Sequence, residues 1–155
     1  MFSMVIGIIS DTHGVLRPQA LEAMSGVEHI LHAGDIGNAD ILDQLRTVAP
    51  VTAIRGNIDL HGPCAALPAT EAIELGGCFL YMVHAIEDLD LNPSAAKIDV
   101  VVYGHSHKPS AVTREGVLYL NPGSAGPRRF SLPVTISLLR LEAGRATPQL
   151  IELAV

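Results

Sequence analysis

The amino-acid sequence predicts an α/β protein in which a parallel sheet from the first half packs on a mixed or second sheet from the second half. Three observations lead to this fold class. Strand and helix signals alternate through the first 55 residues, whereas hairpin signals dominate from residue 70 onward. In addition, five short apolar runs each stop at a side chain that can bind a metal ion. No internal repeat is visible, and we expect a single domain over residues 1–155.

The first half of the chain has a β-α-β-α-β pattern. An apolar run predicts a strand at 4–10, and a short helix bounded by proline and glycine follows at 18–25. Further strands are predicted at 27–33 and 51–55. The helix between these two strands is capped by Asn38 or Asp40, stops at Pro50 and has apolar positions at Ile41, Leu42, Leu45 and Val48. Such units form parallel sheets with right-handed crossovers.

Hairpins are predicted in the second half. Strands at 70–75 and 78–83 flank Gly76-Gly77, which is a two-residue hairpin signal. The same reasoning predicts strands at 110–114 and 117–120 around Glu115-Gly116, and at 134–141 and 148–153 around a turn at 142–145. We expect the segment 86–96 to be a loop with one turn of helix.

Composition limits the classes of partner. A chain of 155 residues buries roughly 68–70% of its extended surface, and its 48% hydrophobic content indicates a globular protein. The net charge is −6, and the only adjacent basic pair is Arg128-Arg129, which excludes duplex nucleic acid as a partner. Two divalent ions would add +4, so that −6 becomes −2, with the added charge at the site. A small anionic substrate therefore fits this chain.

The cysteines and the apolar runs suggest a cytoplasmic protein with no membrane partner. Cys64 and Cys78 cannot form a disulfide framework or a thiolate zinc site, which favours a reducing cytosol. No apolar run approaches the ~18 residues that span a bilayer. The first ten residues lack a basic region, so they indicate a strand rather than a secretion signal. The sequence leaves open whether copies of the chain form a homo-oligomer.

The five strand ends collect hard metal ligands. These are Asp11 and His13 after the first strand, Asp35, Asn57 and His84 after the next three, and His105 and His107 in Gly-His-Ser-His. Ligands bind outside the carboxyl ends of strands in open α/β sheets, so the five ends are expected to converge. Because side chains alternate along an extended segment, Asp11 and His13 would face one side, as would the two histidines of Gly-His-Ser-His. Two carboxylates, four imidazoles and one amide favour Mn, Fe, Ni or Zn, with room for two ions.

Taken alone, each motif also has a structural interpretation that involves no metal ion. Asp-x-His alone is usually a capping or surface pair, and Gly34-Asp35 alone is more often a turn. Five such motifs at successive strand ends are difficult to attribute to chance. Two ions ~3.5–4 Å apart would polarise a shared water and stabilise the attacking and leaving oxygens of a phosphoryl displacement.

The order of these motifs resembles that of the calcineurin-like metallophosphoesterases, over residues 4 to about 129. The motifs are DTH at 11–13, GD at 34–35, GN at 56–57, His84 at a strand end and GHSH at 104–107. The small size and NPGS at 121–124 resemble the compact bacterial and archaeal phosphodiesterases of that superfamily. The resemblance implies a four-layer αββα sandwich of two mixed β-sheets flanked by helices. It also implies hydrolysis of small phosphodiesters by direct attack of a metal-bound hydroxide at a dinuclear centre.

The resemblance assigns a ligand set to each ion. The first ion would be held by Asp11, His13 and His107, the second by Asn57, His84 and His105, and Asp35 would bridge them. Asp35, Asn57 and His84 are the expected catalytic residues, and Asn57 would also hold a substrate oxygen. We expect Mn²⁺, with Ni, Fe, Zn or Mg as alternatives.

Two departures from the family pattern bear on the mechanism. In larger members the residue after Gly-Asn is a histidine that protonates the leaving group. This chain has Ile58 there, and the compact subfamily lacks that histidine too. His61 could replace it, although a surface histidine is the simpler interpretation. Ala85 follows His84 where many relatives have glycine, and because alanine restricts φ we expect weaker binding of the second ion.

Further residues are assigned to substrate binding or to packing. We interpret Asn121 and Ser124 of NPGS first as residues that form a turn. The alternative is that backbone N–H groups of this segment face a phosphate. Arg128 would pair with the phosphate. Ser124 is not expected to be a nucleophile. His32 would be packed or would support a ligand. Specificity is expected to come from the loops at 58–69 and 85–96.

Two rival functions remain. One is a non-enzymatic scaffold, because a eukaryotic relative of this fold is a subunit of the retromer trafficking coat. That relative has lost a metal-ligand histidine, whereas all seven ligand positions are filled here, which favours catalysis. The other is a metal-dependent regulator that binds a nucleotide without rapid turnover.

Overall fold

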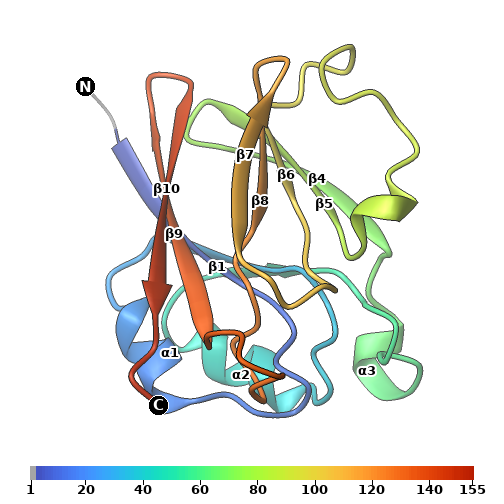
Figure 1. The fold of residues 1–155 in the computed structure, drawn as a ribbon, viewed down its shortest axis with the longest axis vertical. Helices are drawn as coiled ribbons and strands as arrows, with labels where there is room; N and C mark the ends of the chain where they lie inside the picture. Colours follow the sequence, from blue (N-terminus) through green and yellow to red (C-terminus); the bar gives the residue numbers. More distant parts are fainter. Residues whose placement is uncertain (1–2) are drawn as a thin grey trace.

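The computed structural model describes residues 3–155 and contains two five-stranded mixed sheets (Figure 1). Sheet A comprises β1 (Ser3–Ile9), β2 (His29–His32), β3 (Val51–Ala53), β9 (Thr135–Glu142) and β10 (Arg145–Glu152), in the order β10-β9-β1-β2-β3. Sheet B comprises β4 (Thr70–Leu75), β5 (Cys78–Val83), β6 (Val100–Val102), β7 (Ser110–Arg114) and β8 (Val117–Asn121), in the order β4-β5-β6-β8-β7. The helices are α1 (Pro18–Ala23), α2 (Asp40–Arg46) and α3 (Gly62–Ala65), with a 3-10 turn η1 (Ile86–Asp88).

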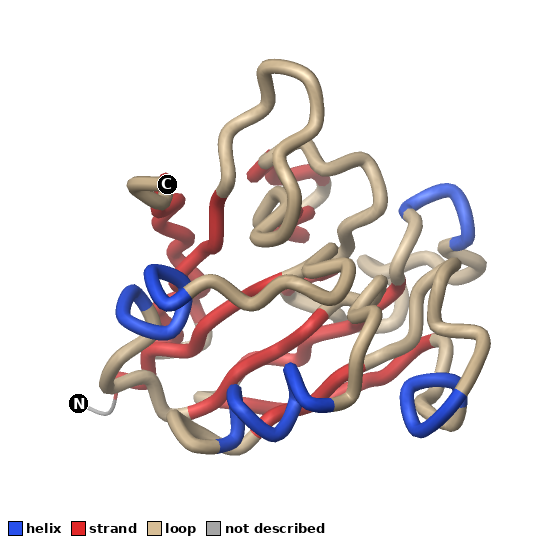
Figure 2. Tube along the Cα trace, turned by 90° about the horizontal axis from the view of Figure 1, so that it is seen from below, coloured by secondary structure: helices blue, strands red, loops and turns tan. Residues whose placement is uncertain are grey.

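The predicted parallel core of the first half is confirmed. Strand β1 pairs in parallel with β2, which pairs in parallel with β3, and the connecting helices α1 and α2 lie on the same outer face of sheet A (Figures 1 and 2). Strand β9 then pairs antiparallel with the free edge of β1, and β10 pairs antiparallel with β9. The four-residue helix α3 was not predicted, because it interrupts a segment that the sequence marks only as a loop.

All three predicted hairpins are present, with one correction. The third turn is shorter than the predicted 142–145, because Glu142 and Arg145 already pair as strand residues. Ala143 and Gly144 both have positive φ, at 51° and 74°, as the tight two-residue hairpin turn requires. This backbone twist matches that of the flanking strands, so the ladder continues to the turn itself.

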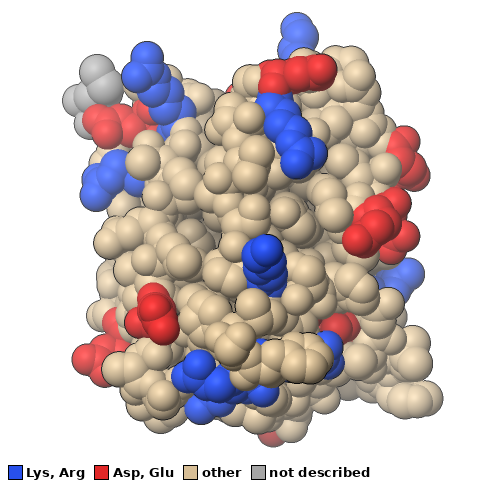
Figure 3. All heavy atoms as spheres, in the orientation of Figure 1, with Lys and Arg blue, Asp and Glu red and all other residues tan. Residues whose placement is uncertain are grey.

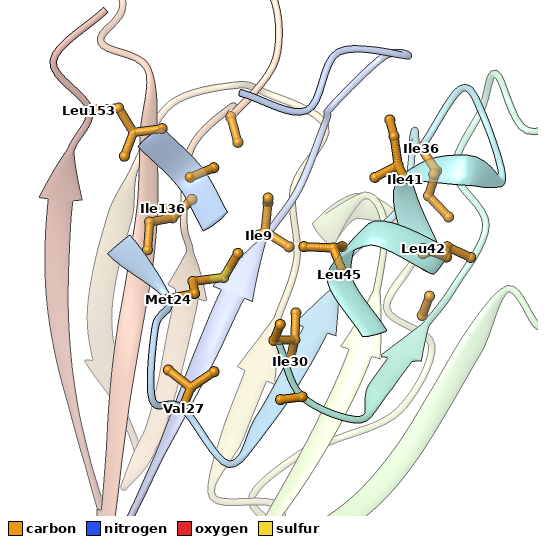
Figure 4. Packing of buried hydrophobic residues seen from close by; sticks show 14 of the residues in the cluster. Ile9, Met24, Val27, Ile30, Ile36, Ile41, Leu42, Leu45, Ile136 and Leu153 are labelled. Carbon is orange, nitrogen blue, oxygen red and sulfur yellow. The ribbon is translucent and has the colours of Figure 1, made fainter. Parts of the chain in front are cut away.

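Three apolar clusters hold the layers together. Side chains from both sheets meet in the middle, where Ile8, Leu80 and Val102 are fully buried. A second cluster lies between sheet A and its helices and includes Met24 and Leu45 (Figure 4). On the outer face of sheet B, the segment 84–99 packs through the side chains Ile86, Leu89 and Ile98. The αββα layering is therefore confirmed, with the fourth layer reduced to η1 and irregular chain.

The topology brings six strand ends to one edge. Strands β1, β2 and β3 run in parallel in sheet A, and β5, β6 and β8 run in parallel in sheet B. The carboxyl ends of β1, β2, β3, β5 and β6 lead into the loops that carry the predicted metal ligands, and that of β8 leads into NPGS. Among the helices of residues 3–155, none has the length and hydrophobicity needed to cross a membrane.

Candidate metal centre

The predicted ligands converge in two groups of three. Asp11, His13 and His107 form one group, and Asp35, His84 and His105 form the other; within each group the candidate ligand atoms lie within 4.8 Å of one another. These groups match the two ligand sets that the resemblance implied, apart from Asn57. The Asn57 side chain is exposed at the end of the loop after β3, beside His84 in a shared pocket.

Both carboxylates are oriented in the same manner. In Asp11, Oδ2 accepts hydrogen bonds from Ser10 Oγ at 2.8 Å and from the backbone N–H of His105 at 3.0 Å. In Asp35, Oδ1 accepts the backbone N–H of Ile58 at 3.1 Å. The second oxygen of each carboxylate is thereby left to face the imidazoles: Asp11 Oδ1 lies 3.5 Å from His107 Nε2.

Asp35 Oδ2 stands between the two groups. It lies 3.4 Å from His13 Nε2 and 3.2 Å from His84 Nε2, one histidine from each group. A single oxygen in this position is suited to be shared by two ions. The bridging role that the resemblance implied for Asp35 stays a prediction.

The ligand loops are turns rather than extended segments, which corrects the alternation argument. Five of the six grouped ligands have left-handed backbone, with φ between 46° and 71°: Asp11, His13, Asp35, His105 and His107. Such residues cost about 1–3 kcal/mol each and are found mainly at functional sites. Backbone hydrogen bonds maintain them: His13 N–H donates to Asp35 O at 2.9 Å, and Asp11 N–H donates to Gly34 O at 3.0 Å.

The glycines that precede the ligands permit close approach. A Cβ on Gly104 would lie 2.6 Å from Asp11 Oδ2, and a Cβ on Gly34 would lie 2.7 Å from His84 Nδ1. Real Cβ atoms do not approach other atoms so closely, so any larger residue would displace a ligand. The glycine in the GD and GHSH motifs is thus explained by packing inside the site.

The unpaired atoms of the site fit a cation. Asp11 Oδ1, His13 Nε2, His84 Nε2 and His107 Nδ1 are buried and have no hydrogen-bond partner. Buried polar atoms without partners are costly and rare in proteins, and here they belong to carboxylate and imidazole groups. His84 Nδ1 lies 2.7 Å from Ala33 O, so it donates its proton there and leaves Nε2 free as a ligand. A divalent metal ion would satisfy these atoms.

The electrostatics keep the two carboxylates ionised. Burial alone would raise the pKa of Asp35, but the adjacent His84 imidazole, the hydrogen bond from the Ile58 N–H and the nearby His13 lower it to about 2. The pKa of Asp11 is also lowered, against the effect of burial, by His13, His84, Ser10 and His107. Both groups therefore carry negative charge at neutral pH, as a cation site requires.

Ala85 corrects one expectation from the sequence. Its backbone has φ −110° and ψ 131°, which is extended conformation that alanine adopts without strain. The position after His84 thus does not need glycine in this chain. The conformational argument for weaker binding of the second ion does not hold.

The NPGS residues are buried and hold the ligand loops. Asn121 Nδ2 donates to Gly104 O and to Ser106 Oγ, both at 3.1 Å. Ser124 Oγ donates to Asp11 O at 3.0 Å. These contacts favour the turn role over direct contact with a phosphate.

Two other predicted residues, Arg128 and His61, are exposed. Arg128 is exposed and donates to Leu132 O at 3.4 Å. It is the neighbouring Arg129 whose charge, after the larger effect of burial, helps to lower the pKa of His107. His61 is exposed at the start of α3. In the view of Figure 3 the Lys and Arg side chains form several separated groups.

Two buried residues support the site: His32, which was expected to be packed or to support a ligand, and Asp59, which was not assigned a role. His32 Nδ1 accepts the Gly34 N–H at 3.1 Å, so its proton is on Nε2, which lies 3.0 Å from Thr12 Oγ1. His32 thus joins the loops that carry Asp11 and Asp35. Asp59 contacts the loops after β2 and β3 and was missed, since the sequence shows only that it follows Ile58.

A pocket of about 310 Å³ lies beside the second group. Asn57 and His84 line one side of it, and Arg55, Thr70, Val83 and Asp88 are among the residues that line the rest. It lies between the two loops in which specificity was expected, at 58–69 and 85–96. The pocket carries one cationic and one anionic side chain.

Comparisons with known proteins agree with this geometry. Residues 4–144 match the calcineurin-like phosphoesterase superfamily domain. The chain is 34% identical to a probable metallophosphoesterase of Methanothermobacter thermautotrophicus, over 96% of this chain and 92% of that protein. It is 32% identical to phosphodiesterase YfcE of Escherichia coli K12, over 84% of each chain. The structure of vacuolar protein sorting 29 from Cryptosporidium parvum superposes with a TM-score of 0.78 at 18% identity, covering all of both chains, and so shares the fold.

Proposed function

The chain belongs to the calcineurin-like phosphoesterase superfamily, and we propose that it is a phosphodiesterase that hydrolyses small phosphodiesters with two divalent metal ions. The observation that carries this proposal is the position of Asp35 Oδ2, near one histidine of each ligand group. Bound ions would supply a polarised water and stabilise charge on the attacking and leaving oxygens. The oxygen- and nitrogen-rich ligand set supports Mn²⁺ first, with Ni, Fe, Zn or Mg as alternatives.

Each ligand has a proposed task. Asp11, His13 and His107 would hold the first ion, and Asn57, His84 and His105 the second, with Asp35 shared. The Ala33 carbonyl fixes the His84 ring so that Nε2 points to the site. Asn57 and Arg128 are proposed to contact the phosphate, since both side chains are exposed. Asn121 and Ser124 would instead hold the loops around it.

The leaving group is proposed to occupy the pocket beside Asn57 and His84. Its volume of about 310 Å³ suits a small alcohol rather than a polymer. Arg55 and Asp88 give its wall no net charge, which does not select for a second phosphate on the substrate. We place the reaction in the cytoplasm, a proposal supported by the unpaired, buried Cys64 and Cys78.

The rival is a binding role without turnover. The likeness to vacuolar protein sorting 29 raises it, but that likeness concerns the fold alone. A complete ligand set with unpaired buried atoms favours the hydrolase.

Hydrolysis of a chromogenic phosphodiester with added Mn²⁺ tests the proposal. We expect turnover that is abolished by a chelator and by Asp35→Ala, and unchanged by His61→Gln on the exposed surface. A fully metallated wild-type protein without turnover would establish the binding role instead.

A further inference from the structure

Asp59 is a buried carboxylate that joins two ligand loops. It is 3% exposed and accepts hydrogen bonds from three backbone N–H groups. Asp59 Oδ1 accepts from Ile36 and Gly37, both at 3.1 Å, and Oδ2 accepts from Ile36 at 3.1 Å and Gly56 at 2.8 Å. Ile36 and Gly37 lie in the loop after β2, whereas Gly56 lies in the loop after β3.

No basic side chain compensates this charge. Among residues 3–155, every hydrogen bond to the Asp59 carboxylate comes from the backbone, and no ion pair includes it. Burying a carboxylate costs several kcal/mol unless hydrogen bonds satisfy it, and here three N–H groups do so. The arrangement fixes backbone positions rather than a side chain.

Two of the three N–H groups belong to residues next to proposed metal ligands. Ile36 directly follows Asp35, and Gly56 directly precedes Asn57. The Ile36 side chain is itself fully buried in the cluster between sheet A and its helices (Figure 4). Ile36 is therefore held both by its side chain and by its N–H. The carbonyl of Ile36 also contacts the DTH loop, because Gly14 N–H donates to Ile36 O at 2.8 Å.

We propose that Asp59 is a positioning residue that sets the distance between Asp35 and Asn57 and so determines the affinity of the second ion. This inference rests on the proposed two-ion function. The first ligand group has contacts of its own that do not involve Asp59: the His105 N–H donates to Asp11 Oδ2, and Ser124 Oγ donates to Asp11 O. The effect of losing Asp59 should therefore fall unequally on the two ions.

Asp59→Asn is the most informative variant. The amide keeps the shape of the carboxylate but replaces one acceptor oxygen with an N–H donor, which would face the N–H of either Gly56 or the Ile36-Gly37 pair. In either orientation, at least one of these backbone N–H groups loses its acceptor. Asp99→Asn is the matched control, because Asp99 Oδ2 accepts the Phe79 N–H at 2.8 Å at the far end of β5.

Calorimetric titration of the metal-free full chain with Mn²⁺ tests the proposal, together with the electron paramagnetic resonance spectrum of the loaded protein. For wild type and Asp99→Asn we expect two bound ions and a spin-coupled Mn²⁺ pair. For Asp59→Asn we expect one ion at near wild-type affinity, the other weakened about 10–100-fold, and an uncoupled spectrum. Asp59→Glu, which keeps the carboxylate, should recover part of the second affinity and is the variant to titrate if circular dichroism shows that Asp59→Asn is unfolded.

Several results would overturn the inference. They are two ions bound by Asp59→Asn as by wild type, equal weakening of both ions, the same loss in Asp99→Asn, or a wild-type protein that binds a single ion. Failure of the hydrolase proposal looks different: the wild-type protein would bind a coupled pair and still release no product from a phosphodiester. In that case the positioning role of Asp59 would stand.

Discussion

The backbone N–H of Ile58 donates to Asp35 Oδ1 at 3.1 Å, at the position where larger relatives carry a proton-donating histidine. Ile58 thus helps to orient the shared carboxylate through its backbone, while its side chain, 44% exposed, offers no proton. In the proposed reaction, position 58 would therefore help to orient Asp35 without supplying a proton to the departing alcohol.

The first prediction concerns the leaving group. Without a positioned acid, the rate should depend strongly on leaving-group acidity, because the alcohol must depart as an anion. Steady-state rates on a series of phosphodiesters, from nitrophenyl to alkyl esters, should fall steeply as the leaving-group pKa rises. Equal rates on activated and unactivated esters would contradict this.

The second prediction restores the missing acid. Ile58→His should raise kcat on an alkyl phosphodiester relative to a nitrophenyl ester, because a positioned general acid contributes up to about 10²–10⁴-fold. The exposed side chain should accept the change with little loss of stability. Leu60→His, at a 69% exposed position two residues on, is the control and should leave the ratio unchanged. A ratio that rises equally in both variants would indicate a nonspecific effect of histidine.

The grouping of the candidate ligands could be predicted from the sequence because residue type and strand order are local information. Asp11, Asp35 and His84 each follow an apolar run, and parallel strands bring such ends together. The left-handed backbone of Asp11 and His105 could not be predicted, since neither residue type requires it. Asp59 was missed because its role exists only when the loops after β2 and β3 meet. The sequence did not decide whether Asn121 forms a turn or faces a phosphate. In the structure its amide donates to Gly104 O and Ser106 Oγ, which favours the turn.

The third prediction separates support from substrate contact. Ser124→Ala removes a buried hydroxyl that donates to Asp11 O, so the free energy of unfolding should fall by about 0.5–1.5 kcal/mol. We expect KM to stay unchanged, since the hydroxyl faces the protein. Urea unfolding and steady-state kinetics measure the two effects. A large rise in KM with normal stability would return Ser124 to the substrate-binding residues.

The fourth prediction concerns Ala85. Since its backbone is extended, Ala85→Gly should not increase the affinity for the second ion. It should instead lower the free energy of unfolding by about 0.5–1 kcal/mol, because glycine loses more freedom on folding. Mn²⁺ titration and urea unfolding of the same variant decide the point. Tighter binding of one ion would show that alanine does restrain His84.

The fifth prediction is a pH dependence that originates at His32. Burial lowers the pKa of His32 from 6.5 to about 4, so the native protein keeps this ring neutral where the unfolded chain protonates it. The unfolded state then binds more protons, and stability is full above pH 6.5 and lost as the pH falls from 6.5 towards 4.

Over the whole window this shift corresponds to a loss on the order of 3 kcal/mol. Urea unfolding of the metal-free protein at pH 7 and pH 5 measures most of it. His32→Gln, which cannot titrate, should be less stable at pH 7 because the contacts to Thr12 and Gly34 are altered, yet should lose less stability between the two pH values. His61→Gln, on the surface, should keep the wild-type pH dependence. If His32→Gln and wild type lose the same stability between pH 7 and pH 5, protons taken up elsewhere account for the loss.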